Sequence, residues 1–254
     1  MSLYRPPPPN HPLLLSAPFF PGASSDASGR TLPSGADLRP LCLAIRNQAQ
    51  QNSCAAFATV ALRELSYAVA TRTPLSDYLS PAYLYARTRI NIGSFPADVP
   101  TSLADQFQTL VTDGVCPEAL FPYDQGLGVV PSRAVDQAAS AFRINQPFQF
   151  DLSVPVANDI RSALANGQAV SIAFPLYQSF GNISKSGVLT LPDAGADPWS
   201  GEYHAVLVCG YDDIKRWWII RNQQGPSWGA NGYGFMPYGY ESHWTEAWTA
   251  PTQA

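Results

Sequence analysis

The chain changes its pattern of apolar residues near residue 144, and this change limits the folds that it can adopt. Before this point apolar side chains recur at helical spacing, as at Phe57, Ala61, Leu65 and Val69, which would form one buried face. After it, short apolar runs separated by turn residues are typical of strands. Helices followed by strands predict an α+β protein with two lobes, and binding sites are common in clefts between lobes.

Three helices are expected in the first half. Asn52 and Ser53 are both good N-caps for the first of them. Ser80–Pro81 predicts the start of a second helix, because a capping serine is followed by proline at the first helical position. Ser102–Asp113 predicts a third helix, which Gly114 would end as a C-terminal cap.

The second half reads as strands with one helix among them. The turn candidate Asp212–Arg216 lies between two apolar runs and predicts a hairpin. The expected strands are Phe148–Leu152, Gln168–Phe174, His204–Tyr211 and Trp217–Arg221, and the expected helix is Val156–Asn166. We expect the β lobe over 145–254 and the helical lobe over 34–144.

Composition excludes several classes of protein. With two lysines and a net charge of −4, a basic nucleic-acid surface is not expected. No run of about 18 apolar residues is present, so we expect no membrane span. The four cysteines form no Cys-x-x-Cys pair, and with three histidines they encode no structural zinc site. Free thiols are the default interpretation, with one of them a candidate for a reactive thiol, and a bridge between Cys42 and Cys116 stays open.

The first 33 residues form a proline-rich extension. They contain eight of the 24 prolines, and the run Pro6–Pro9 predicts polyproline II. Proline on both sides of the apolar Leu13–Leu15 argues against a secretory signal, so we expect a cytoplasmic protein or export by another route. The extension is either a loose tail or, through Leu13–Leu15 and Phe19–Phe20, an apolar strap on the body of the protein.

Two residues are candidates for nucleophilic chemistry. Cys54 begins the strongest predicted helix, where free N–H groups and the helix dipole favour a thiolate. A thiol nucleophile needs a base, and His204 opens an apolar strand. The alternative for each is structural: a packed cysteine, and a half-buried histidine at a strand end.

Asn222 and Gln48 are the remaining candidates. A hairpin loop of Asp212–Ile214 or Asp212–Arg216 leaves Asn222 on the same face as His204, whereas an odd-residue slip would separate them. An amide oxygen there can accept the imidazole N–H and fix the ring, although a turn residue is the common alternative. Gln48, six residues before Cys54, could place its amide near the thiol as an oxyanion donor.

These residues stand in segments that resemble the papain-like cysteine peptidases, in the form seen in bacterial members. The resemblance covers about residues 33–250. It is carried by the glutamine and cysteine segment from Arg46 to Phe57, by His204-Ala-Val, and by the segment from Arg221 to Tyr233. Two family tryptophans are replaced by Ala55 and Gln224, Trp228 is kept, and the glycine-rich segment that binds substrate backbone is not recognisable near Asp98–Ser102.

The resemblance implies a papain-like two-lobed fold, with a helical N-terminal lobe, an antiparallel β-barrel-like C-terminal lobe and the active-site cleft between them. It also implies catalysis by Cys54 as nucleophile, His204 as base and acid, Asn222 as orienter and Gln48 in the oxyanion hole. No metal or organic cofactor is implied. The expected partner is a peptide or protein substrate.

Two other functions stay open: a non-catalytic peptide-binding module on this scaffold, and a transglutaminase-type acyl transferase. We expect a monomer that binds neither nucleic acid nor membrane. The N-terminal segment, residues 1–33, is expected to dock in or near the cleft as an intramolecular inhibitor.

Overall fold

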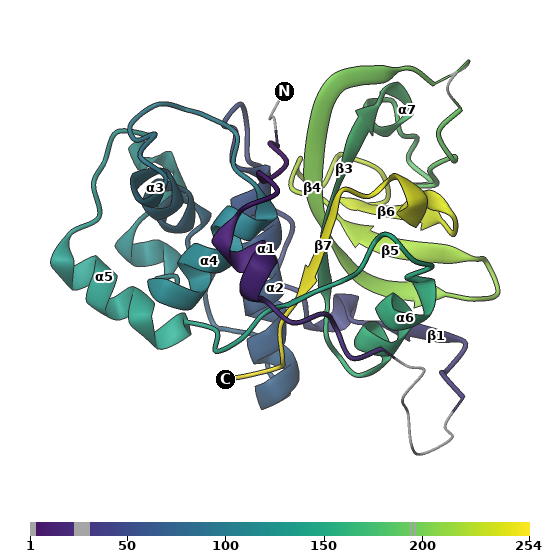
Figure 1. Cartoon of the computed structure of the whole chain (residues 1–254), viewed down its shortest axis with the longest axis horizontal. Coiled ribbons are helices and arrows are strands. Elements are labelled where there is room, and N and C mark those ends of the chain that lie inside the picture. Colours follow the sequence, from purple (N-terminus) through teal and green to yellow (C-terminus); the bar gives the residue numbers. More distant parts are fainter. Residues whose placement is uncertain (1–3, 23–30, 194, 196) are drawn as a thin grey trace.

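A computed structural model describes residues 4–22, 31–193, 195 and 197–254. The helices that precede residue 144 gather on one side of the molecule and the sheet lies on the other (Figure 1). The larger helices of the first half are α2 (Cys54–Thr71), α3 (Pro81–Asn91), α4 (Leu103–Thr112) and α5 (Arg133–Ala139). Short 3-10 helices lie at Arg39–Leu41 (η2), Glu118–Leu120 (η3), Tyr123–Gln125 (η4), Ser140–Phe142 (η5) and Tyr240–His243 (η6).

The predicted helix starts are confirmed, with one difference in chemistry. The Ser80 side chain accepts a hydrogen bond from the Tyr83 N–H at the start of α3, and Ser102 forms a capping box with Asp105 at the start of α4. Ser53 precedes α2 as predicted but makes no side-chain cap. Its hydroxyl is instead bonded to the phenol of Tyr123, which leaves the first N–H groups of α2 without that cap.

The second half forms one antiparallel sheet, as the pattern of short apolar runs predicts. The strands along it run β2-β7-β3-β4-β5-β6, and β1 pairs with β4 beside this path. Within the described part of the chain no pairing joins β2 to β6, so the sheet is open where a barrel-like lobe was expected. The strands are β1 (Gly35–Asp37), β2 (Phe148–Gln149), β3 (Val170–Tyr177), β4 (Trp199–Asp212), β5 (Trp217–Arg221), β6 (Tyr233–Pro237) and β7 (Glu246–Thr249).

Two further helices lie in this half, α6 (Ala157–Ala165) and α7 (Gln178–Gly181). The helix expected over 156–166 is therefore present as α6, and the chain leaves it at Gly167, whose φ of +79° suits glycine. β1 falls in the range expected for the helical lobe, yet it pairs with β4 of the sheet. The chain thus enters the molecule on the sheet side before it forms α2.

The long helix α2 packs against the sheet and forms the centre of the molecule. Fourteen of its side chains are buried, and Ser171 of β3 donates a hydrogen bond to the Ala58 carbonyl of α2. One apolar core joins α2, α3 and α4 to the near face of β3 and β4. A second core fills the space between the other face of the sheet and α6. Burial of apolar side chains on both faces fixes the register of β3 and β4.

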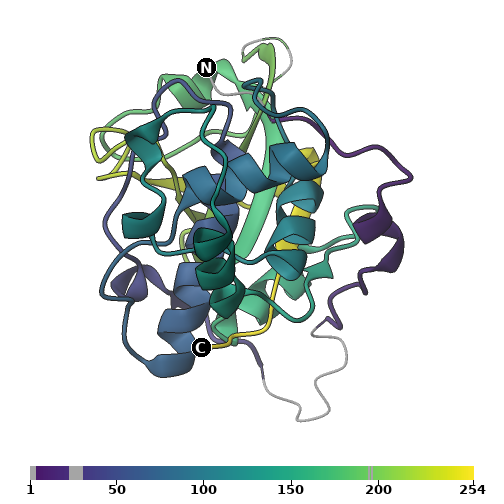
Figure 2. The ribbon, with the colours of Figure 1, turned by 90° about the vertical axis from the view of Figure 1, so that its left-hand side faces the viewer.

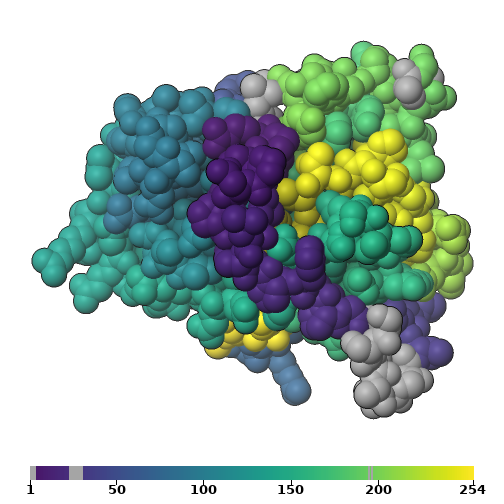
Figure 3. Space-filling model, in the orientation of Figure 1, coloured from purple at the N-terminus to yellow at the C-terminus, as the bar shows by residue number. Residues whose placement is uncertain are grey.

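Residues 4–22 lie across the junction between the helices and the sheet (Figure 3). They run along one edge of the molecule when it is viewed from the helical side (Figure 2). The short helix α1 (Pro12–Ser16), which the sequence pattern did not reveal, lies within this segment. We call residues 4–22 the strap, and its contacts match the strap interpretation rather than a loose tail.

The strap is held at both ends. Near its start, the Tyr4 N–H donates to the Tyr203 carbonyl at 3.0 Å, and the Arg5 N–H donates to the Thr101 carbonyl at 3.4 Å. Tyr203 lies on β4 and Thr101 lies just before α4, so two neighbouring residues of the strap bond to the two halves of the molecule. Tyr4 is only 3% exposed, which is unusual for a residue so near a chain end.

The middle of the strap is anchored to α4 and its far end to β2. His11 Nε2 lies 3.3 Å from Asp105 Oδ1 of α4, with both side chains buried. Phe20 stacks on Phe150 with ring centroids 5.0 Å apart. The Gln149 amide donates to two strap carbonyls. The part of the predicted extension over 23–30 lies outside the described residues.

A buried carboxylate also joins the halves of the molecule. Glu246 of β7 accepts hydrogen bonds from the N–H groups of Leu103 and Ala104 at the start of α4, and from the Trp248 indole. Burial raises the pKa of Glu246 to about 8, against the effect of these three bonds. The Glu246 carboxyl oxygens thus accept hydrogen bonds from two N–H groups at the start of α4 that would otherwise be unpaired.

We therefore expect Glu246→Ala to lower the free energy of unfolding by roughly 3 kcal/mol, because two buried N–H groups lose their acceptor. Urea denaturation measures this change. Asp124→Ala, at an exposed acid, is the matched control and should change stability by less than about 0.5 kcal/mol. Equal stability of Glu246→Ala and the parent would show that the carboxylate contributes nothing at this junction.

Candidate active site

His204 and Asn222 are joined by a buried hydrogen bond. The Nε2 atom of His204 lies 2.9 Å from Oδ1 of Asn222, and both residues are about 1% exposed. Because an amide oxygen only accepts, the proton in the neutral ring is on Nε2. The other ring nitrogen, Nδ1, then keeps the lone pair that a base requires.

A β-bulge brings these two residues to the same face. Near the turn Asp212 pairs with Trp217, and this register would place Asn222 opposite Leu207, on the face away from His204. The pairing shifts by one residue between Val208 and Gly210, so that Leu207 faces Arg221. Continuing this register puts Asn222 opposite Val206, two residues from His204. The hairpin loop is therefore 213–216, which neither predicted loop matches. This loop alone would put His204 and Asn222 on opposite faces, and the one-residue bulge at Cys209 returns them to the same face.

Aromatic rings enclose the imidazole. Phe180 lies 5.3 Å and Phe174 6.2 Å from the His204 ring, centroid to centroid. Trp228 packs on Phe180 at 4.9 Å, and its indole N–H donates to the Phe180 carbonyl. Burial in this apolar site lowers the pKa of His204 to about 4, although the Asn222 hydrogen bond raises it. The ring is therefore neutral near pH 7.

Gln223 follows Asn222 in the chain, and its polar side chain lies beside the His204 imidazole. Its amide nitrogen donates to the Ala205 carbonyl at 2.8 Å and lies 3.4 Å from His204 Nε2. In the structure Trp228 reaches the imidazole through Phe180, and Gln223 lies directly beside it.

Cys54 is the first residue of α2 and is fully buried. The helix N-terminus places the positive end of the helix dipole at this residue. The pKa of the Tyr123 phenol is raised mainly by burial, and the Cys54 thiol contributes in the same direction. Cys54 and Ala205, which follows His204, belong to the same apolar core.

Tyr123 connects the residue before Cys54 to the Gln48 loop. Its hydroxyl lies 2.6 Å from the Ser53 hydroxyl and donates to the Gln48 carbonyl at 2.8 Å. The Gln48 N–H in turn donates to the Gln223 carbonyl at 2.9 Å. One chain of hydrogen bonds thus runs from the start of α2 through the Gln48 loop to the residue after Asn222.

The Gln48 side chain is buried, with its amide nitrogen 3.0 Å from the Gln51 carbonyl. This bond uses one of the two N–H groups of the amide. Its Oε1 atom accepts no hydrogen bond from the described part of the chain. The backbone of the loop is bent at Ala49, which has a φ of +52°.

Three residues of this site were not singled out as site residues from the sequence. Tyr123 stands 69 positions after Cys54 and Phe180 follows a strand without any motif, so spacing alone could not identify them. Gln223 is adjacent to Asn222, and its position beside an orienting residue was the only available signal.

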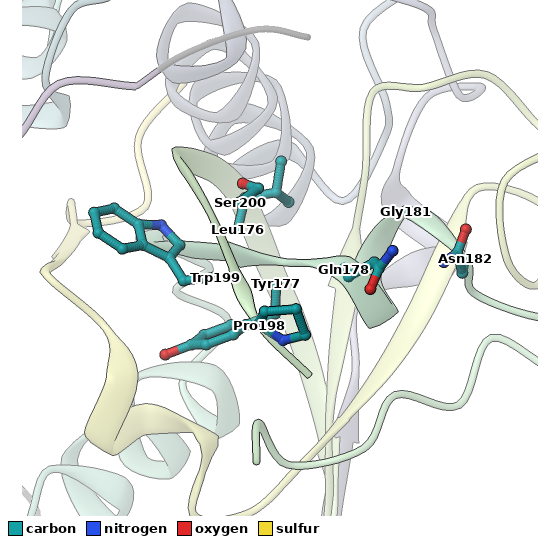
Figure 4. Close-up of a pocket in the computed structure, with 8 residues that line it drawn as sticks. All are labelled: Leu176, Tyr177, Gln178, Gly181, Asn182, Pro198, Trp199 and Ser200. Carbon is teal, nitrogen blue, oxygen red and sulfur yellow. The ribbon is translucent and has the colours of Figure 1, made fainter. Parts of the chain in front are cut away.

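A pocket of about 420 Å³ opens further along β3 and β4. The Trp199 ring lies at one end and the amides of Gln178 and Asn182 at the other (Figure 4). Tyr177 pairs with Trp199, three residues along β3 from the Phe174–His204 pair. The mixed lining can hold an apolar side chain whose end is polar. It comprises Leu176, Tyr177, Gln178, Gly181, Asn182, Pro198, Trp199 and Ser200.

Other expected features can be compared with the structure. None of the four cysteines, all of which the structure describes, forms a disulfide, so Cys42 and Cys116 are not bridged. In the described ranges no helix has the length and apolarity of a membrane span. Over the same residues, no three of the His, Cys, Asp and Glu side chains are grouped as ligands for a metal ion.

A family model and curated relatives point to the same family of proteins. The family model described as papain family cysteine protease matches residues 32–250. Among curated relatives, the oryzain gamma chain of Oryza sativa is 26% identical over 198 residues, which are 77% of this chain and 52% of that protein. A peptidase C1-like protein of Acanthamoeba polyphaga mimivirus is 27% identical over 63% of this chain and 54% of its own. The chain thus spans about half the length of these relatives.

Solved structures agree with the fold. Xylellain, a cysteine protease from Xylella fastidiosa, superimposes with a TM-score of 0.85 and 26% identity, and the match covers 100% of this chain and 96% of that chain. The ragweed pollen cysteine protease Amb a 11 in its proform has a TM-score of 0.70 and 22% identity, with 90% of this chain and 69% of that chain covered. The second likeness concerns the fold alone.

Proposed function

Because the chain belongs to the papain family of cysteine proteases, we propose that it hydrolyses peptide bonds through an acyl-enzyme on Cys54. The observation that carries this proposal is the buried His204–Asn222 hydrogen bond. It fixes the imidazole with Nε2 as donor and leaves Nδ1 as the basic nitrogen. A non-catalytic binding module would not require this arrangement.

The proposed reaction begins with transfer of the Cys54 thiol proton to His204. The thiolate, favoured by the α2 N-terminus, attacks the peptide carbonyl carbon and forms a tetrahedral oxyanion. The Cys54 N–H and the second N–H of the Gln48 amide stabilise this oxyanion, each by roughly 3 kcal/mol. His204 then protonates the leaving amine. Water, deprotonated by His204, attacks the thioester and releases the acid.

Asn222 orients the imidazole in both half-reactions, and Phe180 and Gln223 limit the access of water to the orienting bond. Tyr123 acts as a positioning residue, since it holds the Gln48 loop to Ser53. The two amide side chains and the ring are thereby fixed before substrate binds, which is how preorganised donors contribute to catalysis.

The reaction type is tested by incubating the protein without residues 1–30, which lacks the proposed inhibitory strap, with a casein digest and an excess of a primary amine, followed by mass spectrometry. Hydrolysis predicts new carboxyl termini and internal cleavage. A transglutaminase-type enzyme would instead attach the amine to glutamine side chains. Intact peptides with and without a thiol reductant would contradict the proposal of peptidase activity.

The low pKa of His204 predicts an acid limb of kcat/KM at low pH. The imidazole must be neutral to accept the thiol proton, and burial keeps it neutral down to about pH 4. We expect kcat/KM for a short peptide to fall as pH decreases through about 4. An acid limb near 6.5, the ordinary histidine value, would contradict this account.

We also propose that the strap is an intramolecular inhibitor. Its residue Tyr4 bonds to Tyr203, the residue directly before His204, and Arg5 bonds to Thr101 on the opposite half of the molecule. The strap backbone therefore spans the two halves beside the catalytic imidazole, where an extended peptide substrate would lie. Tyr4 and Tyr203 also contact through their rings, with centroids 6.3 Å apart.

A further inference from the structure

Two cysteines outside the proposed catalytic set lie together on the sheet side of the molecule. The Leu38 N–H donates to the Cys209 carbonyl at 2.9 Å, and the Cys42 thiol donates to the Leu38 carbonyl at 3.7 Å. Cys42 packs against the apolar core that contains Cys209, so Leu38 connects two neighbouring cysteines. The turn η2 therefore folds Cys42 back onto the strand β4.

The position of Cys209 follows from the β-bulge. Cys209 is the extra residue between the Val208–Ile220 and Gly210–Ile219 pairs, so it has no direct partner on β5. Its thiol donates to the Ile219 carbonyl at 3.6 Å. The bulge that aligns His204 with Asn222 thus also sets the position of Cys209 opposite the Leu38–Cys42 turn.

The surroundings of the two thiols differ. The Cys42 side chain is partly exposed, and its pKa is lowered by the Cys209 thiol and then by the Arg221 guanidinium and the Tyr233 hydroxyl. Arg221 is fixed beside Cys42 by hydrogen bonds to the carbonyls of Leu43 and Ala44. Cys209 is fully buried, and its pKa is raised. A partly exposed thiol with a lowered pKa near a buried thiol is typical of a redox-sensitive pair.

We propose that Cys42 and Cys209 form a reversible redox-modification site whose oxidant is a peroxide. The Cys42 thiol first loses its proton to solvent, and the thiolate attacks one oxygen of hydrogen peroxide. The O–O bond breaks, and the leaving hydroxide takes up a proton from solvent, so that a sulfenic acid and one water are formed. The Cys209 thiol then attacks the Cys42 sulfur, forms the S–S bond and releases a second water. Two thiols are oxidised by two electrons while hydrogen peroxide is reduced to two waters.

The other cysteines do not share this arrangement. Cys116 is fully buried among helices, and burial raises its pKa to about 12, so it stays a protonated thiol. Cys54 is the nucleophile of the proposed peptidase reaction. Replacing it leaves Cys42 and Cys209 unchanged. The proposal is therefore independent of the proposed function.

The test uses the full chain with Cys54→Ala, treated with hydrogen peroxide at a few equivalents. Free thiols are then blocked, and the protein is digested without reductant and analysed by mass spectrometry. We expect a crosslink between the Cys42 and Cys209 peptides that disappears on reduction. Cys116→Ser in the same background is the matched control and should leave the crosslink unchanged.

Two variants separate the steps. With Cys209→Ser, Cys42 should accumulate as a sulfenic acid that dimedone traps, and with Cys42→Ser, Cys209 should remain a thiol. The proposal is overturned if the folded protein gives no Cys42–Cys209 crosslink, or if Cys209 is oxidised when Cys42 is absent. It is also overturned if the crosslink forms equally fast in urea, because the fold would then contribute nothing to the pairing.

Discussion

Cys54→Ala is expected to reduce kcat for peptide hydrolysis by about 10⁴-fold or more, because the proposed acyl-enzyme forms on the Cys54 thiol. The replaced side chain is small and buried at the helix start, and alanine favours the helix. The variant should therefore fold, and circular dichroism and thermal denaturation check this. Initial rates on a fluorogenic peptide give the effect.

Cys116→Ala is the matched control, since Cys116 is equally buried but lies away from the hydrogen-bonded chain of the site. It should retain the kcat of the parent within a factor of about three, apart from a loss of stability from the smaller core side chain. Residual hydrolysis in folded Cys54→Ala at the level of the parent would refute the role of Cys54.

Removal of the strap is expected to raise activity. Deletion of residues 1–30 should increase kcat/KM for a short peptide by at least about tenfold, since the backbone that spans the two halves beside His204 is absent. The milder variant Tyr4→Ala weakens the docked state by roughly 3 kcal/mol, as expected for loss of a buried aromatic side chain. It should give an increase in the same direction.

Leu15→Ala is the matched control for the strap, because Leu15 belongs to it and is 73% exposed. It should leave kcat/KM unchanged. A synthetic peptide of residues 4–22 added to the deletion variant should inhibit it again. Unchanged rates in the deletion variant, with the fold intact, would refute the inhibitory role of the strap.

Much of the fold follows from local sequence signals. The starts of α3 and α4 were predictable because Ser80 and Ser102 cap the helix through their own side chains. The boundaries of β5 were predictable because Trp217–Arg221 is a short apolar run that follows a turn. These signals depend only on residues within a few positions of one another.

The details that set the site were not predictable in this way. The bulge at Cys209 is a property of strand pairing, and without it the 213–216 loop would separate His204 from Asn222. Their resemblance to family segments suggested proximity, but the register came only from the structure. The enclosure of His204 by Phe180 and the link through Tyr123 depend on long-range packing, which leaves no local pattern.

The path of the strap was predicted in part. Its apolar residues indicated that it would lie on the body of the protein, yet α1 was not expected in a segment so rich in proline. His11 accepts a hydrogen bond from the Leu13 N–H and Pro12 occupies the first helical position, so a capped start was encoded there. The contact between His11 and Asp105 then fixes this short helix on α4.

The central claim is that the Cys54 thiol and the His204 imidazole act as one proton-transferring pair. The most direct measurement is the rate of Cys54 alkylation by iodoacetamide as a function of pH, followed by peptide mapping in the strap-deleted protein and in its His204→Ala variant. If the pair exists, Cys54 reacts rapidly from about pH 4 upward, and His204→Ala moves the onset to about 8.5, the ordinary value for a thiol. If both proteins react with an onset near 8.5, the two groups do not act together and the proposed mechanism is wrong.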